Sequence, residues 1–181
     1  MKISHIKYSD LENYVFTDVH AKFKDNGFLS AFDFFCIVIW KANRAKSKVA
    51  KRLLKHNKNL EEGVKELTNE IFTAENPKRK FEILFTEYGF RLPMASAILT
   101  ALYPDTFTIY DFRVCETLSD FDKLGDIGNF EKIWEGYKQY IERVTTSEPS
   151  SISLREKDKL FWGTSFFNQL TKDINEQFSK T

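Results

Sequence analysis

Apolar residues recur three or four positions apart along most of the chain, which is the period of helices with one buried face. The first stripe ends at Asn26-Gly27, a pair that favours a turn, and consists of Leu11, Val15, Val19 and Phe23. The segment from Ser30 to Trp40 is apolar on nearly all sides, so we expect it at the centre of the fold. Because no segment alternates as a strand does, the pattern predicts an all-α protein of about eight or nine helices.

Residues that commonly cap helices precede several of these stripes. Ser30 with Asp33, and Ser153 with Glu156, have the spacing of a capping box. Asn59, Asn76 and Asn129 precede three further stripes. The later stripes predict helices over residues 60–71, 77–88, 93–102, 130–144 and 153–170. The segment from Thr145 to Ser151 is rich in turn formers and is typical of a linker.

A tight turn between two predicted helices lies at Gly89 to Pro93. Gly89 can adopt the left-handed conformation that ends a helix, and Pro93 suits the first turn of the next one. The amides of roughly Phe90 to Leu92 would then lack partners, and with Arg91 they form a candidate site for a DNA phosphate. The alternative is an ordinary corner between two helices with an exposed arginine.

Charge is unevenly distributed, although the net charge is only +1. No Asp or Glu occurs between Phe34 and Leu60, where the cationic residues are Lys41, Arg44, Lys46, Lys48, Lys51, Arg52, Lys55 and Lys58. At helical spacing, Arg44, Lys48 and Lys51 share one face. We expect this face, together with Lys41, to bind the DNA backbone through counterion release. A solvated lysine-rich surface is the alternative.

The remaining composition excludes several classes of protein. A chain of 181 residues suits one domain or one domain in two lobes. Cys36 and Cys115 have neither disulfide nor metal-ligand spacing. The N-terminus has no signal-like pattern, and the longest apolar run, Phe34 to Trp40, is too short to span a bilayer. We therefore expect a cytoplasmic, monomeric protein without membrane association, metal or cofactor.

One acid lies close to a cation at the predicted start of a short helix, in Ile109-Tyr110-Asp111-Phe112-Arg113. This segment follows Gly89-Phe90-Arg91 and Ala95 at the spacing of a recognised motif. Together these residues resemble the helix-hairpin-helix DNA glycosylase superfamily, whose hairpin has the pattern L-P-G-h-G-x-x-[TV]-A, where h is apolar. In that family a catalytic Asp comes after the following helix and loop.

The resemblance implies two helical lobes around a cleft. One lobe would contain the hairpin, over residues 59–144, and the other would combine residues 1–58 with a C-terminal helix at 152–178. It implies a monofunctional, cofactor-free DNA N-glycosylase, because Pro93 stands where other members carry a Schiff-base lysine. Arg91 replaces the second glycine of the hairpin. Two cysteines are too few for the iron–sulfur loop of some relatives.

Asp111 would then stabilise the positive charge that develops on the sugar when a glycosidic bond breaks, and would orient or deprotonate the attacking water. Its alternative role is a helix cap paired with Arg113. By the same resemblance Arg113 would bind a phosphate beside the flipped nucleotide, or it would only orient Asp111.

A flipped base is bound by aromatic faces and a few polar groups. The candidates for this pocket are Phe35, Trp40, Tyr110 and Trp162, although aromatic residues at helical spacing are more often part of a core. Two other functions stay open: a DNA-binding module without catalysis, and a helical protein-interaction domain. The identity of the target base cannot be read from the sequence.

Overall fold

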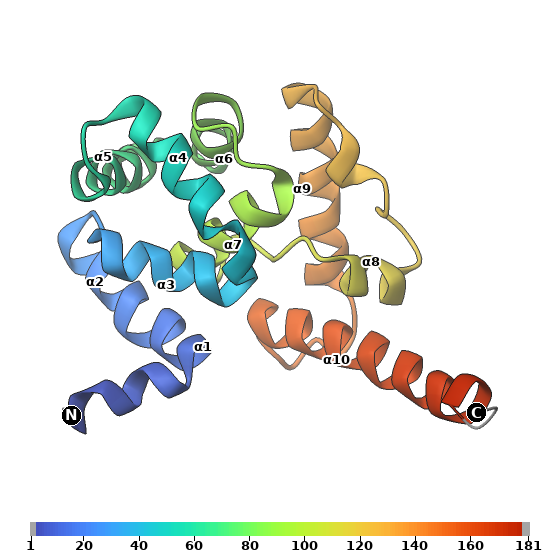
Figure 1. The fold of residues 1–181 in the computed structure, drawn as a ribbon. Coiled ribbons are helices and arrows are strands. Elements are labelled where there is room, and N and C mark those ends of the chain that lie inside the picture. Colours follow the sequence, from blue (N-terminus) through green and yellow to red (C-terminus); the bar gives the residue numbers. More distant parts are fainter. Residues whose placement is uncertain (1–2, 179–181) are drawn as a thin grey trace. The chain divides into compact units, whose positions relative to one another are not determined.

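A computed structural model describes residues 3–178, and this part of the chain contains helices and no strand (Figure 1). The all-α prediction is therefore confirmed. The chain divides into two compact units, with the boundary between Thr106 and Phe107. None of the described helices is both long and apolar enough to cross a membrane.

The first unit has seven α-helices among its described residues. In chain order its elements are η1 (Ile3–Ser9), α1 (Leu11–Tyr14), η2 (Val15–Val19), α2 (His20–Asn26), α3 (Ala31–Ala42), η3 (Asn43–Ala45), α4 (Lys46–His56), α5 (Leu60–Thr73), α6 (Pro77–Glu82), η4 (Ile83–Glu87) and α7 (Leu92–Leu102). Every residue of α7 except Pro93 is buried. The apolar helix α3 packs against α4, α5 and α7, in agreement with its predicted central place.

The helix ends follow the predicted caps. Gly27 ends α2 in the left-handed region, with φ 76°. Asn59 and Asn76 each accept a hydrogen bond from the amide three residues later. At Ser30 only half of the predicted capping box forms, because the Asp33 carboxylate accepts hydrogen bonds from Tyr14 Oη and Lys22 Nζ.

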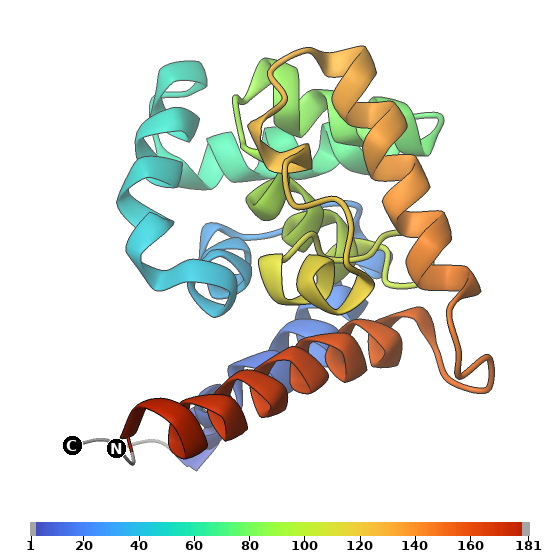
Figure 2. The same ribbon diagram turned by 90° about the vertical axis from the view of Figure 1, so that its right-hand side faces the viewer.

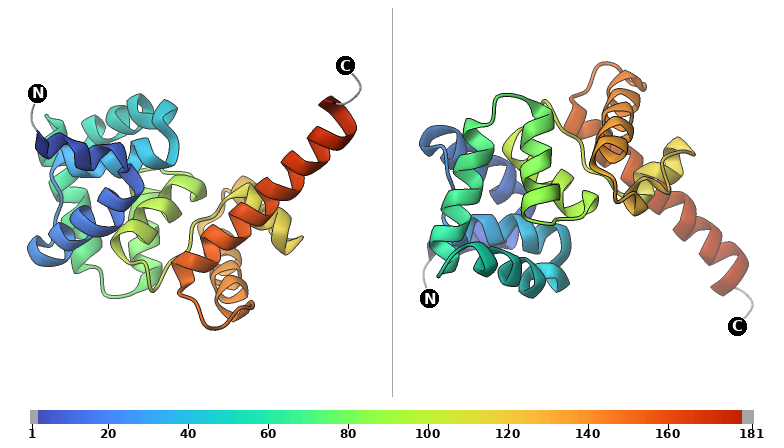
Figure 3. Two further views of the ribbon diagram at one scale, coloured as in Figure 1. Left: turned by 90° about the horizontal axis from the view of Figure 1, so that it is seen from below. Right: turned by 90° about the horizontal axis from the view of Figure 1, so that it is seen from above.

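The second unit begins with an extended segment, residues 107–111. Its helical elements are α8 (Phe112–Leu118), η5 (Leu124–Asp126), α9 (Phe130–Thr146), α10 (Leu154–Lys172) and η6 (Asp173–Gln177). Asn129 caps α9, and Ser153 with Glu156 forms the complete capping box predicted for α10. Helix α10 packs against α8 and α9, and its last turns extend beyond both (Figures 2 and 3).

These units differ from the lobes inferred from the resemblance. The C-terminal helix was expected to pack with residues 1–58. It is α10, and it packs on α8 and α9 of the second unit, with Phe161 and Ser165 among its buried residues. The hairpin, expected in one lobe with Asp111, belongs to the first unit. Both cysteines are buried and free.

Candidate active site and nucleic-acid interface

The hairpin has the predicted backbone. Gly89 adopts the left-handed conformation, with φ 65°, so a side chain there would be strained. Phe90 and Leu92 are buried, while Arg91 is exposed and occupies the N-cap position of α7. The two apolar side chains anchor the turn, and the arginine is left at the surface.

Fewer backbone amides of the hairpin are free than the sequence predicts. The Phe90 amide is not available to an anion, because it donates a 2.8 Å hydrogen bond to Leu84 O at the end of the preceding helix. The amides of Arg91 and Leu92 have no acceptor among the described residues. The N-terminus of α7 therefore offers two amides and the Arg91 charge to an anion.

The basic helix α4 lies directly beside this hairpin. The Arg52 guanidinium carbon is 5.7 Å from the centroid of the Phe90 ring, and the His56 ring stacks on Tyr88 with the centroids 4.5 Å apart. Arg52 is also the nearest group to the position that a Cβ would occupy on Gly89, at 4.0 Å. Two segments separated by some thirty-five positions in the sequence thus form one surface.

The predicted cations of this segment are mostly accessible. Arg44, Lys48 and Lys51 are exposed, whereas Lys41 is half-buried. Arg52 belongs to the same basic run, but the helical pattern gave it no role at a site. The apolar stripe of Val49 and Leu53 next to it is the sequence feature that places Arg52 at the border of the packed face. Both of these residues are buried.

Asp111 caps α8. Its backbone is extended, with φ −141° and ψ 141°, and its carboxylate accepts a 3.1 Å hydrogen bond from the Arg113 amide. The side chain is half-buried. The cap role left open by the sequence is present, and it leaves the carboxylate partly accessible to solvent.

Buried side chains fix the backbone that leads to Asp111. Tyr137 Oη donates to Thr108 O over 2.7 Å, and Tyr140 Oη donates to Ile109 O over 2.8 Å. The buried Asp158 carboxylate accepts hydrogen bonds from the Thr108 hydroxyl and the Ile109 amide. Burial raises the pKa of both tyrosines far above the usual range, so they remain neutral donors.

Tyr110 has a different role from the one expected. Its ring is buried, and its hydroxyl donates to Phe121 O over 2.8 Å and accepts from the Gly125 amide over 3.1 Å. Burial raises the pKa of Tyr110 to about 12. A ring held in this way supports the loop and offers no free face to a base.

Arg113 and Trp162 come together on the surface of the second unit. The Arg113 guanidinium carbon lies 5.2 Å from the Trp162 ring centroid, 5.4 Å from that of Phe166 and 5.1 Å from that of Phe112. Its Nη1 donates to Gln169 over 3.1 Å and to Ser165 over 3.3 Å. The guanidinium is thus directed to α10, while the Arg113 amide donates to the Asp111 carboxylate. Sequence reasoning missed Phe112 and Phe166, although the spacing of Trp162 and Phe166 places them on one face of α10.

The other two predicted pocket residues belong to the first unit. Phe35 packs edge-to-face on Phe34, and Trp40 packs edge-to-face on Phe16 with the ring centroids 5.1 Å apart. Both are half-buried. Of the four aromatic candidates, Tyr110 and Trp162 share a unit with Asp111.

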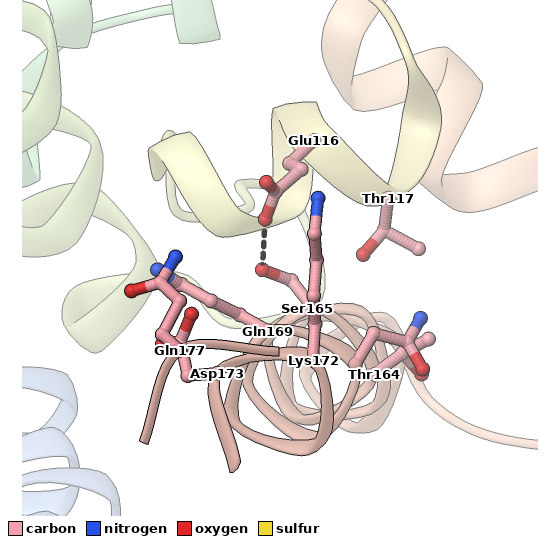
Figure 4. Close-up of a pocket in the computed structure, with 9 residues that line it drawn as sticks. Glu116, Thr117, Thr164, Ser165, Gln169, Lys172, Asp173 and Gln177 are labelled. Carbon is pink, nitrogen blue, oxygen red and sulfur yellow. Dashed lines mark hydrogen bonds between the residues drawn. The ribbon is translucent and has the colours of Figure 1, made fainter. Parts of the chain in front are cut away.

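A polar groove of about 590 Å³ runs between α8 and α10 (Figure 4). Glu116 and Thr117 contribute from α8, and the Glu116 carboxylate accepts a hydrogen bond from the Ser165 hydroxyl. The α10 side and the turns after it contribute Thr164, Ser165, Asn168, Gln169, Lys172, Asp173 and Gln177. Amides and hydroxyls dominate this lining, so it suits a polar ligand.

Comparison with models of protein families, with curated proteins and with solved structures finds no match to this chain. The described residues contain no group of three or more His, Cys, Asp or Glu side chains that could hold a metal ion.

Proposed function

We propose that this protein is a monofunctional DNA N-glycosylase of the helix-hairpin-helix type, with the hairpin in its first helical unit and Asp111 in its second. The observation that carries the proposal is the placement of Asp111. Its carboxylate is partly accessible, and the extended backbone before it is fixed by three buried side chains, Tyr137, Tyr140 and Asp158. A carboxylate in a fixed position stabilises developing positive charge without having to reorganise during the reaction.

In the proposed reaction a modified or damaged base leaves the duplex stack and is released by hydrolysis. The bond between the base and the sugar lengthens, and positive charge develops on the sugar ring. The Asp111 carboxylate stabilises this charge and directs water to the anomeric carbon. The water gives its proton to the Asp111 carboxylate as its oxygen bonds to the sugar. The base leaves with the electron pair of the broken bond and takes up a proton from solvent.

DNA binding is assigned to the first unit. The hairpin offers the Arg91 and Leu92 amides, and Arg52 lies beside it on α4. The exposed Lys48 and Lys51 extend the positive surface along the same helix, and Arg44 adds a charge from the preceding turn η3. Such contacts position a protein on the DNA backbone without reading its sequence.

The test is Asp111→Asn. Incubation of the chain with duplexes that carry different modified bases, followed by alkaline cleavage at abasic sites, is expected to show release of at least one base. Asp111→Asn should abolish that release and leave duplex affinity within about twofold, because the amide keeps the shape and can still cap α8. Full activity of this variant would refute the proposed mechanism.

A second candidate function is a DNA-binding module without catalysis. The surface formed by Arg52 and the hairpin favours this function as well. It predicts salt-sensitive duplex binding with no abasic product from any base in the panel. A helical protein-interaction domain predicts neither of these results.

A further inference from the structure

Three exposed aromatic side chains surround one guanidinium at the start of α8. Phe112 is 66% exposed, Trp162 is 44% exposed and Phe166 is 43% exposed. Trp162 and Phe166 are stacked, with an interplanar angle of 9° and 5.5 Å between centroids. Arg113 lies within cation–π distance of all three rings. We call these four residues the aromatic–guanidinium cluster.

The guanidinium is held in place but keeps unused donors. Its Nη1 donates to Ser165 and Gln169, and Ser165 in turn donates to Glu116. A guanidinium has N–H donors on three nitrogens. Those on Nε and Nη2 have no partner among the described residues. The cluster therefore combines flat apolar faces with hydrogen-bond donors that have no partner among the described residues.

This combination fits a planar ring that carries acceptor atoms. Nucleobases stack on aromatic and guanidinium planes, and base carbonyl oxygens and ring nitrogens accept hydrogen bonds from arginine. The cluster also follows Asp111 directly, and the Arg113 amide contacts the Asp111 carboxylate. A base bound here would contact Phe112 and Arg113, which directly follow the proposed catalytic residue in the chain.

The position of Arg113 determines which bases are suitable. Bare aromatic faces attract cationic rings. In this cluster one guanidinium already interacts with all three rings, so a cationic base stacked on them would meet a like charge. The two nearby carboxylates are bonded elsewhere than on the guanidinium: Glu116 accepts from the Ser165 hydroxyl, and Asp111 accepts from the Arg113 amide.

We infer that the aromatic–guanidinium cluster binds the target base and selects neutral bases with carbonyl acceptors over cationic, ring-alkylated bases. This inference deepens the proposed function and rests on it for the catalytic role of Asp111. The substrate class is then an oxidised, deaminated or otherwise neutral modified base, and N-alkylated cationic purines are excluded.

The test compares guanosine with 7-methylguanosine, which differ by one methyl group and one positive charge in weakly acidic solution. Each nucleoside is titrated into the whole chain by isothermal titration calorimetry. The wild-type chain should bind guanosine about tenfold more tightly. Arg113→Gln should reverse this preference, because the rings are then free to attract the cation. Phe166→Ala should weaken both nucleosides by about tenfold.

Arg143→Gln on α9 is the matched control, since it removes one exposed positive charge from the same unit and should leave the preference unchanged. Equal or tighter binding of 7-methylguanosine by the wild-type chain, or binding of neither nucleoside, would overturn the inference. Nucleoside binding requires no base release. A retained preference in a chain that releases no base would therefore refute the glycosylase proposal and leave the cluster assignment standing.

Discussion

The hydroxyl of Tyr140 shows how an uncharged group can control the position of a proposed catalytic acid. It donates a 2.8 Å hydrogen bond to Ile109 O, two residues before Asp111, and the whole side chain is buried. Tyr140→Phe leaves that carbonyl buried without its donor, at a cost of about 1–3 kcal/mol. Because the backbone before Asp111 then loosens, we expect base release to slow about tenfold or more. Duplex affinity should change by less than about twofold, because the proposed contacts to the DNA backbone lie in the first unit.

Tyr103→Phe provides the comparison for this prediction. The Tyr103 hydroxyl accepts from Lys80 Nζ and donates to Ile71 O, and all three residues belong to the first unit. Chemical denaturation should show a loss of stability in both variants, whereas base release should slow only in Tyr140→Phe. An equal effect of both variants on base release would mean that Tyr140 does not position Asp111.

Helix α4 and the hairpin are distant in the sequence and become neighbours through folding. Arg52→Gln removes the guanidinium from the Phe90 ring and one positive charge from the surface beside the Arg91 and Leu92 amides. We expect weaker duplex binding regardless of sequence, and a plot of log affinity against log salt whose slope is smaller by about one. Fluorescence anisotropy with two unrelated duplexes at several salt concentrations measures both quantities.

Arg79→Gln is the control for this prediction, because it also removes one positive charge from the first unit. Arg79 pairs with Glu82 and Glu87 on the adjoining turns. Its removal should leave the salt slope unchanged. If the two variants alter the slope equally, net charge and not the contact with the hairpin governs binding.

The elements themselves were largely predictable because their ends depend on residues a few positions apart. Asn59, Asn76, Asn129 and Ser153 each cap the helix that the sequence assigns to them. The left-handed Gly89 follows from the same local chemistry. Local pattern also placed Asp111 at a helix start, where it caps α8.

The supports of the candidate site were not predictable, since they join residues that are distant in the chain. Asp158 holds Thr108 across 50 positions, and Arg52 meets Phe90 through tertiary packing. No period or spacing encodes these pairs. The same limit explains Tyr110, whose position next to Asp111 suggested a pocket, whereas its hydroxyl bonds to the backbone of residues 121–125.

At the scale of the whole molecule, each unit contains its own buried polar anchor. In the first unit, Asp33 accepts hydrogen bonds from Lys22, Tyr14 and Ser30. Burial alone would raise the pKa of Asp33, but these donors lower it below its usual value. A carboxylate with a lowered folded-state pKa stabilises the fold above its unfolded pKa of about 4, and this contribution is lost as the pH falls through the folded-state pKa.

Asp33→Asn should therefore destabilise the first unit at neutral pH by about 1–3 kcal/mol, and the difference from the wild-type chain should shrink below about pH 4. Hydrogen exchange followed by mass spectrometry can locate the effect. Exchange should quicken in peptides from residues 11–102 and stay unchanged in those from 107–172, because Asp33 and its partners belong to the first unit. Tyr140→Phe should give the reverse pattern. Faster exchange in both units from either substitution would show that the two units unfold as one cooperative body.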